Sequence, residues 1–286
     1  MEKTSGTEGD ERMERNNVNR ILHTMTPFLA LFLTERLLLM LAARLLPEVG
    51  DGVRVGIFFF AAAVAFLLFR AVQYPEEPET DPVPELTKKG AGRCLLHLAA
   101  AFAALVTMMF VVAAYMNGDA AFSDTVSVAG EMPSFSPLSV LSLLLIHPAA
   151  EEFLFRRCFY GDLRRMNPVF GCMAQAVMFA IMHDSVDGML YALAAGVILG
   201  ILAEETGRLW PCVAAHMLVN ARSLISVTLF AERGGVRYAM DSGILTLGAV
   251  AFVVLAATRA RSASAAERQA EREEREGARK KQEAGT

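Results

Sequence analysis

The chain is a series of long apolar segments separated by short polar joints. A membrane-spanning helix needs roughly 20 mostly apolar residues, and eight segments meet this description, at about 21–46, 53–74, 93–116, 136–158, 167–185, 188–207, 209–230 and 241–261. Inside lipid every backbone amide must be hydrogen-bonded within its own segment, so a bundle of helices fits these runs. The pattern therefore predicts an all-α, polytopic transmembrane bundle of about eight helices.

The composition agrees with this prediction. Hydrophobic residues make up 54% of the 286 residues and charged residues 20%, and the mean hydropathy is +0.37. The charges concentrate at the two ends and in a few joints, which is typical of a membrane protein. Nothing in the sequence supports nucleic-acid binding, and the lipid bilayer is the expected environment.

The positions of lysine and arginine predict the topology. Basic residues are frequent in the N-terminal tail, in the loop before residue 93, at Arg164 and Arg165, at Arg208 and in the C-terminal tail, whereas the intervening loops contain few. Cytosolic loops carry the excess of Lys and Arg, so both termini are predicted to be cytosolic. The Ala- and Arg-rich composition is typical of bacterial proteins and favours the bacterial cytoplasmic membrane.

Polar stretches divide the chain into five parts. Residues 1–20 form a polar tail that we expect to be disordered, and residues 21–74 form a two-helix unit. Residues 75–92 contain four prolines and an acidic cluster, which exclude a helix and predict a flexible cytosolic linker. Residues 93–262 are the predicted six-helix membrane domain, and residues 263–286 are a charged tail without an apolar stripe.

Several polar residues at membrane depth have a structural interpretation. Glu35 and Arg36 are adjacent and lie in the middle of the first apolar segment, where a charge is costly unless it faces protein or water. We interpret them as a pair that helps the first helix dock. His23 and His97 lie near helix ends, where a histidine needs no function. The cysteines have no paired spacing and are interpreted as small apolar fillers: Cys94, Cys158, Cys172 and Cys212.

The stretch "AEEFLFRR" at residues 150–157 ends an apolar run with four charges. Glu152 and Arg156 are four residues apart and share a helix face, so they can neutralise each other where an unpaired charge would be costly. Glu151 is rotated by about one hundred degrees and lacks that partner. A carboxylate beside a fixed ion pair is a candidate general base, and Arg157 is a predicted interfacial anchor.

Two further motifs place imidazoles at membrane depth. The motif "FAIMH" ends at His183, and in "HMLVN" His216 and Asn220 are four residues apart on one helix face. Burying an imidazole beside a carboxamide has a cost that structure alone seldom requires. A glutamate near a histidine can take a proton from water, while a second histidine and an asparagine can stabilise an oxyanion. This set of side chains suits the hydrolysis of a peptide bond.

The same residues would also suit a metal. Glu151, His183 and His216 supply one carboxylate and two imidazoles. A catalytic Zn²⁺ can bind such a set of ligands while it keeps an open position for water. No HExxH sequence is present, so the pattern of soluble zinc proteases does not apply. His147, four residues before Glu151, is a rival ligand unless Pro148 kinks the helix and turns it away. The residues alone leave a metal-dependent and a metal-free site open.

In their order along the chain, these motifs resemble those of the CPBP family of intramembrane proteases, also called the Abi or CAAX-protease family. "EEFLFRR" resembles its EExxxR motif, "FAIMH" its FxxxH motif and "HMLVN" its HxxxN motif, and the resemblance covers about residues 136–227. It implies a multi-helix membrane peptidase, commonly labelled a metalloprotease, with a protein or peptide substrate at the membrane. Eukaryotic members remove the last three residues of prenylated CAAX proteins, whereas bacterial relatives are linked to bacteriocin processing or self-immunity.

The resemblance also implies a role for each matched residue. Glu151 and His183 would activate the water, His216 and Asn220 would form the oxyanion site, and Glu152 with Arg156 would support Glu151. Two other classes of function stay open: a non-catalytic scaffold or bacteriocin-immunity protein, and a proton-coupled transporter, since Glu and His at membrane depth also build proton paths.

Helix depth conflicts with this assignment. In straight helices His183 lies about 24 Å by rise from the inner start of the fifth segment, whereas His216 lies only about 10 Å from the inner start of the seventh. The two imidazoles can meet only if the segment boundaries differ or if a helix is broken or tilted, which is tolerated where the backbone lines a cavity.

Overall fold

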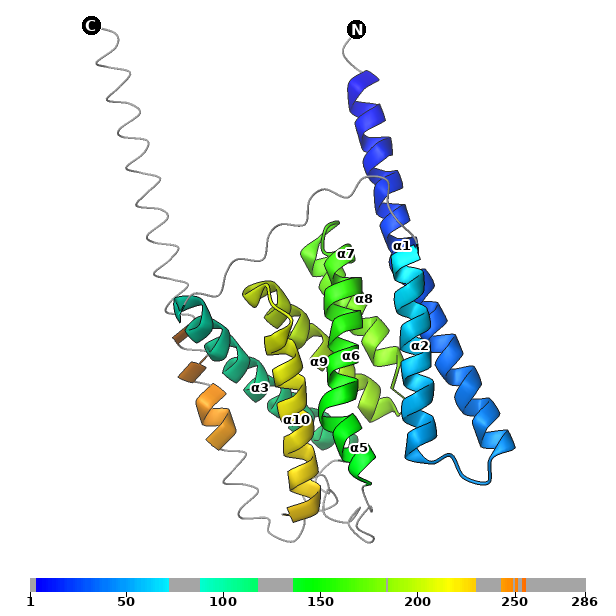
Figure 1. Cartoon of the computed structure of the whole chain (residues 1–286). Helices are drawn as coiled ribbons and strands as arrows, with labels where there is room; N and C mark the ends of the chain where they lie inside the picture. The colour runs from blue at the N-terminus through cyan, green and yellow to red at the C-terminus, as the bar shows by residue number, and fades with distance from the viewer. Residues whose placement is uncertain are drawn as a thin grey trace, which may run out of the picture.

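The computed structural model describes residues 4–71, 88–117, 136–183, 185–229, 243–248, 250–251 and 254–255. Within these residues every regular element is helical, which confirms the predicted all-α class. Six of the helices are α1 (Thr4–Leu45), α2 (Asp51–Ala71), α3 (Lys88–Asn117), α8 (Pro168–Ile181), α9 (Val186–Thr206) and α10 (Trp210–Leu229). Figure 1 shows α10 along one side of the middle helix of the bundle and α1 with α2 along the other.

The middle helix is continuous but not uniform. It consists of α5 (Pro137–Leu141), η3 (Ser142–Ile146), α6 (His147–Glu152), η4 (Phe153–Tyr160) and α7 (Gly161–Leu163), where η3 and η4 are π-helical; we refer to it as the central helix. It begins with Ser136, whose side chain accepts a hydrogen bond from the amide of Ser139 at 3.1 Å, and with a proline in its first turn. π-Helical turns are rare and are frequent at functional sites. The α6 segment with its two glutamates lies between two of them.

Among the residues that the structure describes, four segments are long and apolar enough to cross a membrane: Gly52–Ala71, Gly90–Val112, Pro137–Leu163 and Val186–Thr206. The fold is therefore a helical membrane bundle, as predicted. The fifth predicted span, residues 167–185, is wrong in length, because α8 has only 14 residues and rises about 21 Å. The eighth, residues 241–261, is helical at the few positions described there and lies partly outside the described residues.

The boundaries near the ends also differ from the prediction. The polar tail that we expected to be disordered is helical from Thr4 onward, as the first part of α1. The helix α3 starts at Lys88, so it includes the last five residues of the predicted linker. The rest of that linker, residues 75–87, and the charged tail, residues 263–286, lie outside the described residues.

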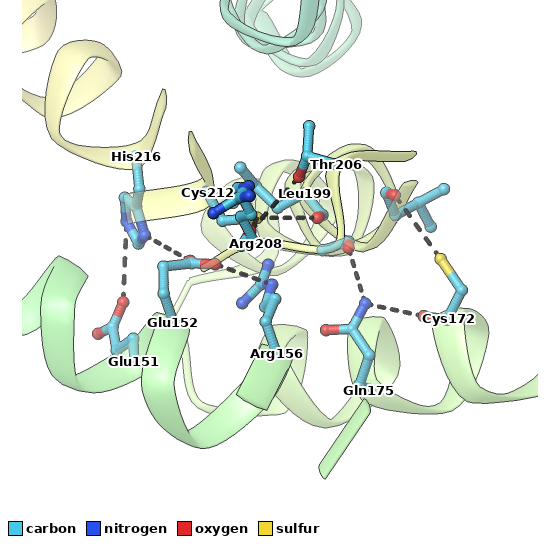
Figure 2. Close-up of polar contacts among 12 residues, drawn as sticks. Glu151, Glu152, Arg156, Cys172, Gln175, Leu199, Thr206, Arg208, Cys212 and His216 are labelled. Atoms are coloured by element: carbon cyan, nitrogen blue, oxygen red, sulfur yellow. Dashed lines mark hydrogen bonds and ion pairs between the residues drawn. The ribbon is translucent and has the colours of Figure 1, made fainter. Parts of the chain in front are cut away.

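A close contact between α8 and α9 fixes the short helix in place. A Cβ atom at Gly196 would lie 2.7 Å from the Cα atom of Ala176, and one at Gly200 would lie 2.7 Å from the sulfur of Cys172. Small residues four apart allow two membrane helices to approach in this way. Gln175 Nε2 adds a hydrogen bond of 2.7 Å to the carbonyl of Gly196 (Figure 2). The helix α8 is therefore held closely against α9, and it also contacts η4 of the central helix.

A polar junction attaches the first two helices to the central helix. Asp162 in α7 accepts hydrogen bonds from Arg20 Nη1 at 2.9 Å, His23 Nδ1 at 2.9 Å and Thr24 Oγ1 at 3.3 Å. The other ring nitrogen of His23 lies 2.9 Å from the carbonyl oxygen of Phe69 in α2. A carboxylate and a carbonyl only accept, so a His23 ring with a proton on both nitrogens satisfies both partners.

The core consists of aromatic and small residues from all these helices. Phe155 and Phe159 of η4 are almost completely buried and stack edge to face, with their centroids 5.5 Å apart. Leu31, Leu105 and Leu199 come from three other helices and are also buried. All four cysteines are buried and free, as predicted for apolar fillers.

Candidate active site

The predicted ion pair is present and fully buried. Arg156 Nε lies 3.0 Å from Glu152 Oε2, and the two side chains are 1% and 0% exposed. The guanidinium also lies over the ring of Phe179, 4.7 Å from its centroid, which is a favourable cation–π contact at a buried position. Figure 2 shows the arginine between Glu152 and Gln175. The ion pair is thus built into the packing of the central helix against α8.

Glu152 also anchors the first histidine. Its Oε1 atom lies 2.9 Å from His216 Nδ1, and because a carboxylate accepts, the ring nitrogen donates. This bond fixes the orientation of the ring, as carboxylates do for functional histidines in general. Figure 2 shows His216, from α10, reaching both glutamates of α6. The other ring nitrogen, Nε2, lies 3.7 Å from Glu151 Oε2.

Exposure separates the two adjacent glutamates. The Glu151 side chain is 23% exposed, whereas that of Glu152 is 0% exposed. The distance of 3.7 Å from Glu151 to His216 is longer than a hydrogen bond, and a gap of this size between polar atoms is often bridged by water. Glu151 is therefore the glutamate that a small molecule can reach, and the supporting role of Glu152 stays a prediction.

The second histidine, His183, contacts the same aromatic ring as His216, that of Phe179. The His183 Nδ1 atom lies 3.0 Å from the Phe179 carbonyl, so in a neutral ring Nε2 carries the lone pair. The Phe179 ring contacts His183 and His216, with centroid distances of 5.1 and 6.0 Å. The two imidazoles thus lie at one level of the bundle. The conflict of depth predicted from straight helices is therefore absent from the structure.

Asn220 has a contact that the sequence did not predict. Its Nδ2 atom donates a hydrogen bond of 2.9 Å to the carbonyl of Leu143, in the π-helical η3. A π-turn changes the regular pattern of backbone bonds, and the amide satisfies one of the carbonyls there. Asn220 thereby ties α10 to the central helix, one turn from His216. An oxyanion role for its second N–H stays a prediction.

His147 lies at the edge of this group. Its Nδ1 atom is 3.3 Å from Ser142 Oγ, and its ring packs edge to face on Phe58 of α2 at a centroid distance of 4.4 Å. The ring is close enough to His216 for their charges to interact. The side chain is therefore held between the central helix and α2.

The residues as placed do not form the predicted zinc site. A catalytic zinc takes three protein ligands and a water, and Glu151 with His216 supplies two adjacent donors. Among the described residues, no three His, Cys, Asp or Glu side chains come together closely enough to hold a metal ion. We therefore derive no chemical step through a metal, and a bound Zn²⁺ stays a prediction.

Two charged residues of α1 lie closer to the site than the sequence indicated. Arg36 Nη2 donates a hydrogen bond to the carbonyl of Met182, the residue before His183. Glu35 is close enough to Glu151 for the two carboxylates to repel each other. The signal in the sequence was the pair of charges in mid-segment, which we interpreted only as a docking device.

Comparisons with known proteins find a similarity to one family over the segment that carries this site. Residues 133–222 match the family model described as Type II CAAX prenyl endopeptidase Rce1-like. A curated relative, "Putative membrane peptidase YdiL" of Bacillus subtilis (strain 168), is 29% identical over 85 residues, which cover 29% of this chain and 35% of the relative. No solved structure matches the chain. The segment that carries Glu151, His183, His216 and Asn220 is thus similar to the type II CAAX prenyl endopeptidases, which confirms the family resemblance indicated by the three motifs.

Proposed function

We propose that the protein is an intramembrane endopeptidase that hydrolyses a peptide bond of a membrane-associated or lipidated protein or peptide. The observation that carries the proposal is the pair of Glu151, which is accessible, and His216. This pair lies beside the fully buried Glu152–Arg156 ion pair. This pair lies within the segment that matches a peptidase family. A cluster of ionisable groups at one level, on three helices, also fits a hydrolytic site better than a series of proton carriers.

The proposed reaction begins with a water between Glu151 and His216. Glu151 takes a proton from this water as the general base, and His183 assists it in activating the water, as the family resemblance implies. The water oxygen attacks the carbonyl carbon of the substrate. The electron pair of the C=O bond moves to its oxygen. The tetrahedral intermediate then breaks its C–N bond, and the proton held by Glu151 passes to the leaving amine.

The predicted oxyanion donors are the Nε2–H of His216 and the second N–H of Asn220, since preorganised donors at such a position stabilise the intermediate. Charge balance supports this role for His216. Glu151, Glu152 and Arg156 together carry one net negative charge when all are ionised, so a doubly protonated His216 makes the buried group neutral, as a membrane interior favours.

The family supports a substrate cut near a lipidated C-terminus, and the site lies among membrane helices, where a lipid-anchored chain has access. We further propose that the protein lies in the bacterial cytoplasmic membrane with both termini cytosolic, as the distribution of Lys and Arg predicts.

The test is cleavage by the purified full-length chain in detergent. The probes are a quenched fluorescent peptide that ends in farnesylated Cys-Val-Ile-Met, its unprenylated counterpart and a membrane-proximal peptide. We expect Glu151→Ala and His216→Ala each to lower the rate by about 10²–10⁴-fold, the usual contribution of acid–base groups. The control is Glu48→Ala, which changes an exposed glutamate outside the site.

The outcomes distinguish the alternatives. If both variants cleave as well as the wild type, the assigned site is wrong. A wild-type chain that cuts none of the probes but co-purifies with a protein partner would instead support the scaffold or immunity protein. Metal analysis, with chelation and zinc restoration of the active sample, tests the prediction of Zn²⁺ separately.

A further inference from the structure

The first helix runs antiparallel to the central helix. Thr24 contacts Asp162, Phe28 stacks edge to face on Phe159 at 6.4 Å, and Glu35 lies within electrostatic reach of Glu151. Thr24 and Glu35 are eleven positions apart in the sequence, and so are Glu151 and Asp162. The equal spacing shows one continuous register, in which the turn of α1 that carries Glu35 lies opposite the two glutamates of α6.

On the same turn, Arg36 reaches the other side of the site. Its Nη2 atom donates to the carbonyl of Met182, which is the last residue of the turn that ends α8. The last carbonyls of a helix lack intrahelical partners. A guanidinium can donate hydrogen bonds to them, and its positive charge interacts favourably with the negative end of the helix dipole. The next residue is His183, whose Nδ1 atom bonds the carbonyl of Phe179 one turn back. Arg36 therefore bonds the backbone one residue from a proposed catalytic imidazole.

We propose that Arg36 is a positioning residue of the active site, which fixes His183 by holding the carboxyl end of α8 through the Met182 carbonyl. The inference rests on the proposed function. It also extends the site beyond the segment that matches the family, because α1 lies outside residues 133–222.

Docking of α1 alone does not require this contact. The other end of α1 is held by the Asp162 junction, where Arg20 contributes a hydrogen bond of 2.9 Å, and the middle is held by Phe28 against Phe159. A role in docking and a role in positioning thus belong to different arginines of one helix, and each can be removed separately.

The first experiment measures kcat and KM on the farnesylated peptide in full-length variants. We expect Arg36→Ala to lower kcat by about 10–100-fold with little change in KM, which is the usual loss when a partner that orients a functional histidine is removed. Arg36→Lys, which keeps a donor and a charge, should recover part of this loss. The matched control is Arg20→Ala, which removes a hydrogen bond from α1 to Asp162 in α7; it should keep the wild-type kcat.

The second experiment tests whether Arg36 acts through His183. In single-turnover measurements, Arg36→Ala should cause no further loss when it is combined with His183→Ala, because residues that act as a unit are not additive. A loss that multiplies in the double variant would overturn the proposal, since it would show that Arg36 supports the fold in general. Thermal unfolding of each variant shows whether it is folded. If Arg36→Ala does not fold, the same measurements are made with Arg36→Lys.

A readout without substrate completes the design. Hydrogen exchange of the peptide segment from Ile181 to Gly188 should become faster in Arg36→Ala and stay unchanged in Arg20→Ala. If His183→Ala cleaves like the wild type, the proposed function of His183 fails. If His183→Ala is inactive while Arg36→Ala keeps the wild-type kcat and exchange, only the present proposal fails.

Discussion

At the scale of single residues, two adjacent glutamates have different environments because successive positions on a helix face different directions. Glu152 is bonded to Arg156 and His216 and has no exposed surface, whereas Glu151 meets His216 across 3.7 Å and is partly exposed. One glutamate therefore holds the structure of the site, and the other is available to water.

This difference predicts that the same substitution lowers activity at one glutamate and stability at the other. Glu151→Gln should remove the general base and lower the cleavage rate by about 10²–10⁴-fold, while the melting temperature in detergent stays near that of the wild type. Glu152→Gln should lower the free energy of unfolding by about 3–5 kcal/mol, because it leaves the buried Arg156 without its counter-charge. Thermal unfolding and peptide cleavage measure the two effects. Equal losses of stability in both variants would contradict this assignment.

The sequence predicts such contacts only when both partners lie on one helix. The Glu152–Arg156 pair follows from a spacing of four residues, and the structure confirms it. The bond from Asn220 to Leu143 joins residues 77 positions apart and depends on a π-turn, and the bond from Arg36 to Met182 spans 146 positions. No local pattern encodes these two, so the sequence could mark Asn220 and Arg36 as unusual but not name their partners.

At the scale of elements, the short α8 decides the geometry of the site. Its start has a clear signal, because Asn167 accepts hydrogen bonds from the amides of Val169 and Phe170 and Pro168 follows it. Its end does not, since the residues up to Met182 remain apolar. Hydrophobicity counts apolar residues and not helical ones, so the predicted span of residues 167–185 extends a few residues beyond the end of α8.

The contact of α8 with α9 gives a prediction at this scale. Gly196→Ala should lower the free energy of unfolding by about 1–3 kcal/mol, as overpacking does, because the new Cβ atom meets the backbone of Ala176 at 2.7 Å and neither helix can yield locally. Cleavage should fall too, since α8 carries Phe179 and His183. The control is Gly56→Ala in α2, where a Cβ meets nothing within 4 Å and where alanine stabilises a helix by up to about 1 kcal/mol. Thermal unfolding in detergent compares the two variants, and an equal melting temperature for both would show that the helices are not closely packed at Gly196.

At the scale of the whole molecule, polar junctions near helix ends join the helices of the bundle to one another. Asp162 attaches α1 and α2 through three donors, as described above, while Glu204 at the end of α9 accepts from Arg164 and from Tyr160 at 2.6–2.9 Å. Glu205 lies 3.5 Å from His97 in α3. These junctions are unequal, because the Asp162 side chain is 10% exposed whereas Arg164 and Glu204 are 45% and 35% exposed.

Burial predicts which junction stabilises the molecule. Asp162→Ala should lower the free energy of unfolding by about 3–5 kcal/mol, because it removes the carboxylate that pairs with the partly buried Arg20 and the buried His23. Arg164→Ala removes an exposed ion pair and should cost at most about 1 kcal/mol. In limited proteolysis of the full chain in detergent, Asp162→Ala should release a fragment that contains α1 and α2 sooner than the wild type does. Equal stability of the two variants would mean that the packing of Phe28 on Phe159 is enough to hold α1. Arg36 would then keep its position at the site even without the Asp162 junction.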